Sequence, residues 1–260
     1  MQAFDYAKPA SVADATRAAA ADGAKPIAGG QSLLASMKLG LAAPEALIDL
    51  GGIADLQGIR VADGVVRIGA MTTHAAVGDS AEVQRAIPAL ATLAGQIGDR
   101  QVRHRGTLGG SLANNDPAAC YPAAALGLGA TVHTDRRDIA ADDFFLGLYE
   151  TALAEGELIT AVSFPVPAKA GWQKFKQPAS RFSIVGVFVS QGPQGVRVAV
   201  TGAGAGVFRA ADLEARLAKD WSAAALAGAS VSADALSSDL HGSAEYRAAL
   251  IPVLAARAVA

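Results

Sequence analysis

Two glycine-rich segments, residues 28–34 and 105–117, constrain the fold more than any other feature of this chain. The first follows a short apolar run and precedes a helical turn at 33–37, so it joins a strand to a helix. Glycines at such a junction let successive backbone N–H groups point into one concavity, which suits a diphosphate. No Gly-Lys-Ser/Thr follows, so this is not a Walker motif. The alternative interpretation is a tight turn capped by Ser32.

The second segment supplies two hydroxyls, two side-chain amides and three glycines, without a pair of carboxylates. We expect a long loop over 103–115 that leads into a helix capped by Asp116 and entered at Pro117. A polar loop with a helix cap is the alternative interpretation. Two donor-rich segments about 75 residues apart favour a shared anionic ligand, and a dinucleotide with its long diphosphate fits both.

A third glycine set, residues 202–206, follows a strand pattern at 196–201 and imitates a Rossmann fingerprint. That fingerprint requires an acidic residue about 20 positions further on, at the end of a second strand. Asp220 lies near the right distance, but residues 211–217 have a helical pattern with no intervening strand. We therefore interpret the third set as a turn between a sheet and a helix.

Composition excludes several classes of function. The 22 Lys and Arg against 24 Asp and Glu give a net charge of -2 without a basic run, so we expect no nucleic-acid partner. The one Cys cannot form an intramolecular disulfide, a Cys-rich zinc site or an iron–sulfur cluster. The start of the chain lacks signal-peptide features, and the longest uncharged run, 117–134, contains two Pro and two Gly. We expect a globular cytoplasmic protein without a membrane span.

The positions of cysteine and histidine in the sequence do not indicate a hydrolytic site or a metal site. Cys120 falls in the apolar run that follows Pro117, so we expect a core thiol inside a helix rather than a nucleophile. The four histidines, His74, His104, His133 and His241, show no metal-ligand spacing. We interpret each as a surface or capping residue, and we expect no metal and no catalytic residue on this chain.

Secondary-structure patterns divide the chain into three lobes, and the fold class is α+β. We place the lobes at 1–55, 56–167 and 171–260, with a linker at 165–171 rich in Pro and Gly. The predicted strands are 26–28, 46–50, 65–70, 158–164, 172–176, 184–190 and 195–201. The predicted helices are 11–21, 33–37, 81–86, 89–97, 117–126, 211–217, 222–227 and 243–258.

Residues 28–34, 37–38, 47–50 and 101–117 resemble the two flavin motifs of the FAD-binding medium subunits of molybdenum hydroxylases. Relatives in that family include the carbon monoxide dehydrogenase medium subunit and the flavin domain of xanthine dehydrogenase. Residues 242–247 and 257–258 are similar to its C-terminal signature. The resemblance implies a two-lobed FAD-binding domain of the PCMH (vanillyl-alcohol-oxidase-like) type. It further implies a small C-terminal α+β domain of the carbon monoxide dehydrogenase flavoprotein type, with a three-stranded antiparallel sheet and helices.

The resemblance also implies which residues bind a non-covalent FAD. The first segment would wrap the diphosphate, and the second would complete the cradle. Other positions match residues near the isoalloxazine ring, near the adenine or ribose, and a lysine that approaches the flavin. In that order, the implied cofactor-binding residues are Ile27, Ala28, Gly29, Gly30, Gln31, Ser32, Leu33, Thr107, Gly110, Ser111, Asn115, Ile97, Ile159 and Lys176. Cys120 stands where the family usually has Asp, which removes one expected polar contact.

The implied activity is that of an oxidoreductase subunit. Molybdopterin would lie in a large partner subunit and two [2Fe-2S] clusters in a small one, as a dimer of heterotrimers. The flavin would pass electrons to an external acceptor, which can be NAD, a quinone or oxygen, and the substrate pocket would lie in another polypeptide. Two alternatives stay open: a free-standing FAD-dependent oxidoreductase of the same fold, and a nucleotide-binding scaffold without redox turnover. The roughly 90 residues after Gly171 are few for the substrate domain that the first alternative needs.

Overall fold

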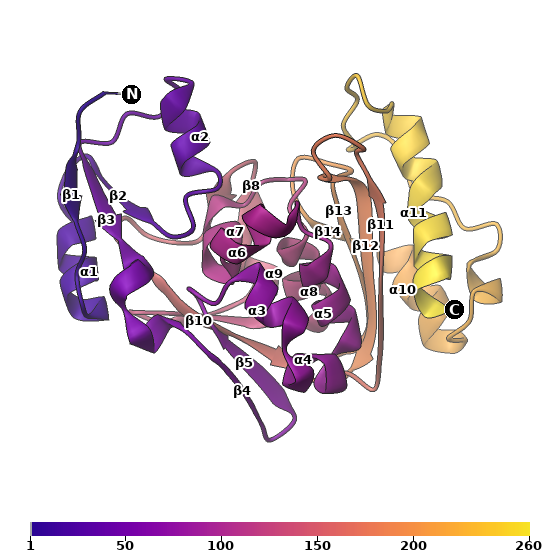
Figure 1. Ribbon diagram of the computed structural model, residues 1–260. Helices are drawn as coiled ribbons and strands as arrows, with labels where there is room; N and C mark the ends of the chain where they lie inside the picture. The colour runs from indigo at the N-terminus through magenta and orange to yellow at the C-terminus, as the bar shows by residue number, and fades with distance from the viewer. Residues whose placement is uncertain (1) are drawn as a thin grey trace.

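A computed structural model describes residues 2–260, so Met1, the first residue of the predicted 1–55 lobe, lies outside the described residues. Three main sheets follow one another across the molecule, from the indigo N-terminal lobe to the yellow C-terminal helix (Figure 1). The first sheet is parallel, with β3 between β1 and β2. Its elements are β1 (Asp5–Ala7), α1 (Val12–Ala19), β2 (Ala24–Ile27), α2 (Leu33–Lys38) and β3 (Ala46–Asp49).

Local signals explain how this first lobe forms. The hydroxyl of Ser11 accepts a hydrogen bond from the Asp14 N–H and caps α1, as the sequence predicts. Ala15 and Ala19, one turn apart, then face a small apolar cluster with Ile48 and Leu50. Two 3₁₀ turns, Leu50–Gly52 and Ala54–Leu56, lead into the second lobe. The cluster also contains Leu56, Met71 and Leu158 of the second lobe, so a small core apart from the main one joins the two lobes.

The second lobe has an antiparallel five-stranded sheet in the order β4-β5-β10-β6-β7, beside a group of short helices (Figure 1). Alternate residues of the central strands, such as Val66 and Ile68, are buried, which is the pattern of a half-covered sheet. The strands are β4 (Ile59–Ala62), β5 (Val65–Gly69), β6 (Thr131–Thr134), β7 (Asp138–Ala140) and β10 (Ile159–Pro165). The helices are α3 (His74–Asp79), α4 (Ala81–Ala86), α5 (Pro88–Gly95), α6 (Arg100–Arg105), α7 (Leu108–Asn114), α8 (Tyr121–Leu128) and α9 (Ala141–Phe144). A small hairpin, β8 (Phe145–Gly147) and β9 (Glu150–Thr151), follows α9.

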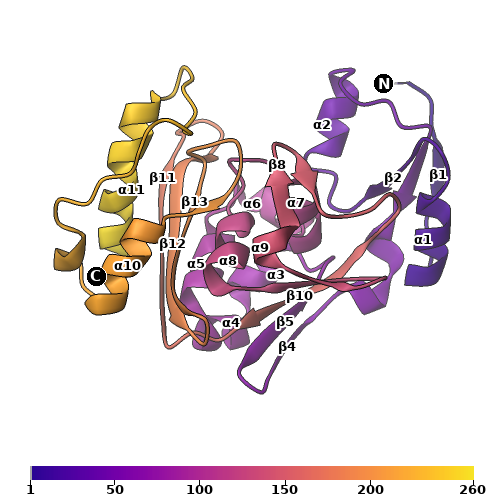
Figure 2. The same ribbon diagram turned by 180° about the vertical axis from the view of Figure 1, so that it is seen from behind.

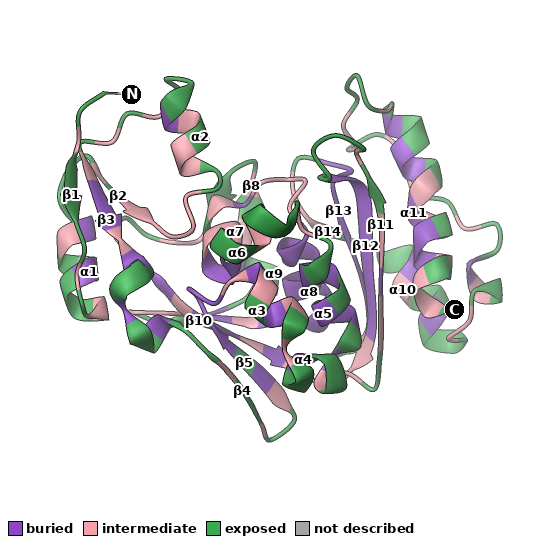
Figure 3. Cartoon of the chain, viewed as in Figure 1, coloured by how far each residue is buried: buried purple, intermediate pink, exposed green. Residues whose placement is uncertain are grey.

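The third sheet is antiparallel and lies between two layers of helices (Figures 1 and 2). Helices α5 and α8 cover one face, and α10 and α11 cover the other. Its central strand β12 is therefore buried over most of its length, as Figure 3 shows. The elements are β11 (Lys169–Lys176), β12 (Ser183–Gly192), β13 (Gly195–Thr201), β14 (Phe208–Arg209), α10 (Ala211–Lys219), a 3₁₀ turn (Ala224–Leu226) and α11 (Ala244–Val259).

The third sheet shares a continuous hydrophobic core with the second lobe. Gly127 of α8 allows the close approach, because a Cβ atom there would lie 2.9 Å from Cδ1 of Phe188 on β12. Arg197 on β13 adds a buried polar connection. Its guanidinium donates to the Leu126 carbonyl at 2.8 Å and to the Asp142 carboxylate at 2.6 Å. The two parts are thus joined by packing and by polar contacts, of which those of Arg197 are buried.

The α+β fold class and most elements agree with the sequence analysis, including α4 and β13 over their full predicted ranges. Several expectations were wrong. The expected loop over 103–115 consists mostly of α6 and α7, and the following helix begins at Tyr121. The C-terminal sheet has four strands rather than three. The fourth strand, β14, was not predicted because two residues are too few to give a strand pattern. The predicted helix 222–227 is one 3₁₀ turn, and the linker shortens to 166–168.

None of the helices within residues 2–260 is long and apolar enough to cross a bilayer.

Candidate functional site

The structure brings the two glycine-rich segments into direct contact. A Cβ atom on Gly29 would lie 2.0 Å from the carbonyl oxygen of Arg105 and 2.8 Å from Cα of Gly106. A Cβ atom on Gly110 would lie 3.1 Å from Cβ of Ala28. Only glycine permits this approach of one backbone to another. The segments therefore form one cradle, which the sequence predicted as a shared site without showing the contact.

The first half of the cradle lies between β2 and α2. Gly30 has a φ of +71°, in the left-handed region that favours glycine, and the Gln31 side chain donates to the Gly29 carbonyl at 3.2 Å. Ser32 precedes α2, but its hydroxyl makes no capping hydrogen bond and its side chain is exposed. The capping interpretation of Ser32 is thus wrong, and the hydroxyl is free to serve a ligand. Ile27 and Leu33 are half-buried at the two ends of the turn.

The second half of the cradle begins at the N-terminus of α7. The Thr107 hydroxyl caps this helix by accepting from the Gly110 N–H at 3.2 Å. The backbone is fixed to the second lobe, because the Leu108 N–H donates to Thr72 and the Gly109 N–H donates to Ala70. A Cβ on Gly109 would lie 2.6 Å from Cβ of Ala70, so this glycine serves close packing inside a helix. Ser111 is half-buried one turn further along.

Asn115 ends α7 in a left-handed conformation with a φ of 42°. Its side chain is buried, and its amide nitrogen donates to the carbonyls of Gly147 at 2.9 Å and Glu150 at 2.8 Å. Its Oδ1 is buried without a hydrogen-bond partner among the described residues. Asn115 therefore connects the cradle to the β8–β9 hairpin, a contact that the sequence pattern did not indicate.

Cys120 is buried, as expected, but it precedes α8 instead of lying within a helix. Lys174 on β11 reaches it, with Nζ 3.2 Å from Sγ and 3.3 Å from the carbonyl of Gln96. This places Lys174 beside Ile97, one of the implied flavin contacts. Lys176 is exposed near the end of β11, and Ile159 is buried at the start of β10. Lys174, two positions before the implied Lys176, is thus the half-buried lysine that makes these contacts.

His74 was expected as a surface or capping residue, but it is buried. The residue is 5% exposed, and a Cβ atom on Gly106 would lie 2.5 Å from its Nε2. Its centroid lies 5.2 Å from that of Tyr121, whose hydroxyl is buried without a partner in the described part of the chain. Burial, with a smaller contribution from the charge of Arg103, lowers the pKa of His74 to about 4. His74 therefore packs behind the second half of the cradle as a neutral ring.

The lowered pKa of His74 predicts a loss of stability in acid. The unfolded chain binds a proton at this ring below about pH 6.5, whereas the folded chain does so only near pH 4. The free energy of unfolding should therefore fall from pH 6.5 to pH 4, by about 3 kcal/mol in total. Urea unfolding at several pH values between 6.5 and 5 measures the slope. His74→Gln, which cannot titrate, should have a flatter slope, and equal slopes would contradict a buried neutral His74.

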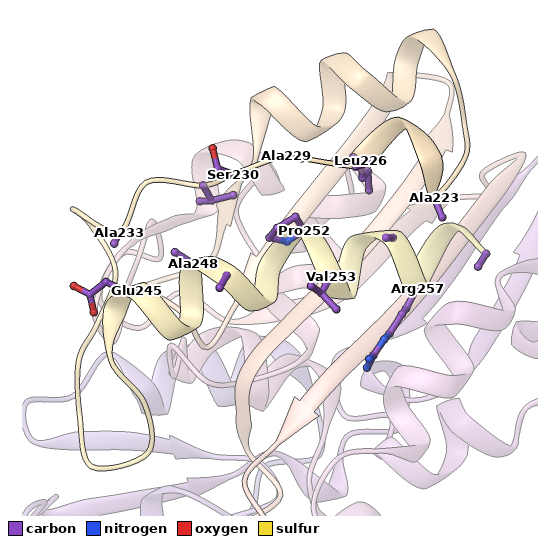
Figure 4. Close-up of a pocket in the computed structure, with 16 residues that line it drawn as sticks. Ala223, Leu226, Ala229, Ser230, Ala233, Glu245, Ala248, Pro252, Val253 and Arg257 are labelled. Atoms are coloured by element: carbon purple, nitrogen blue, oxygen red, sulfur yellow. The ribbon is translucent and has the colours of Figure 1, made fainter.

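The structure also has hollows outside the cradle. One, of about 890 Å³, runs along α11 and is lined mainly by Ala, Val and Pro side chains, with Glu245 near one end and Arg257 near the other (Figure 4). The other, of about 210 Å³, lies where Pro117 meets the C-terminal lobe. Arg247 lines it and donates to the carbonyls of Ile184 and Gly202, both at 2.7 Å. The C-terminal signature thus anchors the third glycine set, which precedes β14 and α10 as a turn and not a Rossmann loop.

Comparisons with known proteins agree with this geometry. Residues 2–167 match the model of the FAD binding domain in molybdopterin dehydrogenase. The chain is 38% identical to the nicotine 6-hydroxylase medium subunit of Paenarthrobacter nicotinovorans, over 100% of this chain and 97% of the relative. It is 36% identical to the carbon monoxide dehydrogenase medium chain of Hydrogenophaga pseudoflava, over 98% and 96% of the two chains.

Solved structures agree as well. A chain of the reconstituted CO dehydrogenase from Oligotropha carboxidovorans superposes with a TM-score of 0.89 at 34% identity, over 99% of this chain and 96% of that one. A chain of quinoline 2-oxidoreductase from Pseudomonas putida 86 gives 0.88 at 31% identity, with the same coverage. The glycine cradle, the matched domain and these full-length relatives together show that the chain belongs to the FAD-binding medium subunits of the molybdenum hydroxylases, a family of oxidoreductases.

Proposed function

We propose that this chain takes electrons from a [2Fe-2S] small subunit and passes them through its FAD to an external acceptor. The contact between the two glycine-rich segments carries the proposal, because it brings together two donor-rich stretches of backbone of the kind that bind a diphosphate. When bound, FAD supplies the redox chemistry, since it can accept and release electrons singly. The protein binds and orients the cofactor.

The residues fit FAD at three places. Backbone N–H groups of residues 27–33 and the free Ser32 hydroxyl would hold the diphosphate from one side. Thr107, Gly110 and Ser111, with Asn115 at the end of the same helix, would hold it from the other side. The half-buried Ile97 would pack near the isoalloxazine, with Lys176 approaching it, and Ile159 would pack near the adenine or ribose.

The assembly follows the same reasoning. One Cys cannot bind the iron–sulfur clusters, so a small partner subunit would hold them, and a large one would hold molybdopterin and the substrate. We infer a cytoplasmic dimer of heterotrimers from the family. Within the chain, we infer FAD-binding lobes at 1–55 and 56–167 and a C-terminal domain at 171–260. The different substrates in the names of the relatives, nicotine and carbon monoxide, agree with a substrate site outside the medium subunit.

Non-covalent binding of FAD can be tested directly on the purified chain. Precipitation with acid should release yellow FAD into the supernatant, because hydrogen bonds and packing alone hold the cofactor. Absorbance of the supernatant near 450 nm and chromatography against authentic FAD measure the result, and addition of dithionite should bleach the native spectrum. Yellow colour that stays with the pellet would contradict the non-covalent cradle. A colourless protein that takes up no added FAD would contradict the proposed function.

A further inference from the structure

One polar residue from each of the five strands in the second lobe's sheet lies on the same face of that sheet. Arg60 on β4 lies opposite Arg67 on β5, and Ser163 on β10 is the other neighbour of Arg67. On the other side of β10, His133 of β6 lies opposite Asp138 of β7. The residues that alternate with these five are mostly buried against the short helices. The five polar side chains therefore lie on the outer face, away from the helices that run along one side of the sheet (Figures 1 and 2).

Three of these side chains are joined by hydrogen bonds. Nδ1 of His133 lies 2.6 Å from Oδ1 of Asp138, and Nε2 of the same ring lies 2.7 Å from Oγ of Ser163. A carboxylate only accepts hydrogen bonds, so Nδ1 carries a hydrogen atom and donates to Asp138. The neutral ring then accepts from the serine hydroxyl at Nε2. A serine bonded to an imidazole that a carboxylate orients has the arrangement of a nucleophilic serine, which is recognised by geometry and not by sequence position.

Burial fixes the imidazole but leaves the serine within reach of a small molecule. The side chain of His133 is 17% exposed and that of Asp138 is 66% exposed, while Ser163 is half-buried. The ring is thus held between two strands, with its carboxylate partner toward solvent. His133 and Ser163 are 30 positions apart and meet only because β6 pairs with β10. For this reason the sequence pattern contains no sign of the arrangement.

Two arginines beside the serine favour a substrate with a negative charge. Arg60 and Arg67 are exposed and lie directly opposite each other, which is unfavourable for two like charges. Within residues 2–260, neither of them forms a salt bridge, not even with Asp63 in the turn between their strands. The Asp138 carboxylate on the same face is bonded to His133. An anion bound beside the two arginines would relieve their repulsion.

We propose that Ser163 is the nucleophile of a second site, separate from the FAD cradle, and that its substrate is a small ester that carries a carboxylate. In the first step the bond from Oγ to the acyl carbon forms and the ester C–O bond breaks. His133 takes the hydroxyl proton at Nε2 and gives it to the departing alcohol, while Asp138 holds the ring in the required tautomer. Water then cleaves the acyl-serine, which releases the acid and restores the hydroxyl. Arg67 stabilises the negative charge on the carbonyl oxygen, and Arg60 binds the carboxylate.

The test treats the full chain, with FAD bound, with diisopropyl fluorophosphate, which reacts with serines that a neighbouring base activates. A bond from Oγ to phosphorus replaces the P–F bond, fluoride leaves, and mass spectrometry of peptides locates the adduct. We expect the label on Ser163, and Ser163→Ala should abolish it. Asp138→Asn should slow labelling by at least about a hundredfold, because the amide favours the wrong tautomer of His133. The matched control is Ser222→Ala, since Ser222 is also half-buried but donates to Asp220 at 2.7 Å, and it should label as the wild type does.

Two 4-nitrophenyl esters of similar size, the hydrogen succinate and the neutral butyrate, test the substrate class. The succinate should have a kcat/KM at least about tenfold higher, as expected for one charge-assisted hydrogen bond, and Arg60→Ala should lower that preference. Asp138 is exposed, so Asp138→Asn is expected to fold, and retention of FAD checks this. Absence of the label from Ser163, or labelling that Asp138→Asn does not slow, would overturn the assignment of the nucleophile. An equal kcat/KM for the two esters would overturn the carboxylate-bearing substrate.

Discussion

Gly29→Ala is expected to lower the affinity for FAD by at least about thirtyfold, which corresponds to about 2 kcal/mol. The new Cβ atom would lie 2.0 Å from the Arg105 carbonyl oxygen, and that oxygen belongs to backbone that cannot rotate away. The two halves of the cradle therefore have to separate. Titration of the apo-protein with FAD, followed by quenching of flavin fluorescence, measures the dissociation constant.

A matched glycine provides the control for this experiment. Gly206 has open space where a Cβ atom would go, so Gly206→Ala should bind FAD as the wild type does. Circular dichroism of both variants checks that the chain stays folded. Wild-type affinity in Gly29→Ala would show that FAD does not depend on the contact between the segments.

Arg197→Ala is expected to reduce the free energy of unfolding by about 2–4 kcal/mol, the largest stability effect that we expect from one substitution. The change removes the side-chain donor to the Leu126 carbonyl, which keeps the Gly129 N–H at 3.2 Å, and it removes the closest charge partner of the Asp142 carboxylate. Asp142 is partly exposed and water can reach it, so the expected value lies below that of a fully buried pair. Urea unfolding followed by tryptophan fluorescence measures the change.

The control for this second prediction is an exposed arginine. Arg17 pairs with Asp14 on the surface of α1, so Arg17→Ala should cost less than about 0.5 kcal/mol. An equally small effect for Arg197→Ala would mean that the contacts of Arg197 add little to the packing of the C-terminal sheet on the second lobe.

Signals that are local in sequence predicted the elements well. The patterns at 81–86 and 195–201 predicted α4 and β13 over their full ranges, and the helix predicted from residue 11 is α1, which Ser11 caps. Features that depend on residues far away in the sequence were not predicted. Gly109 and Gly110 suggest a loop, yet both lie in α7. They are glycines there because Ala70 and Ala28 pack closely against them. No local pattern shows such a neighbour.

The candidate site likewise has features that the sequence predicted and features that it did not. The donor-rich segments were recognisable because their residue types are unusual for their length, whereas their contact depends on tertiary packing. His74 gave no signal, since a histidine is buried or exposed according to what packs around it. The place of Lys174 beside Cys120 depends on the registry of β11 against β12, which sequence spacing does not determine.

The small core between the N-terminal lobe and the second lobe has a consequence for cofactor exchange. The second lobe and the C-terminal sheet share one large core and should unfold as a single cooperative unit, while α1 and β1–β3 rely on a few alanines, isoleucines and leucines. We therefore expect half of the cradle to sit on a part of the molecule that is locally less stable than the main core. Partial opening of that lobe would release or admit FAD while the rest of the fold stays intact. Bound FAD would contact both units, so we expect it to stabilise the N-terminal lobe and to slow hydrogen exchange there.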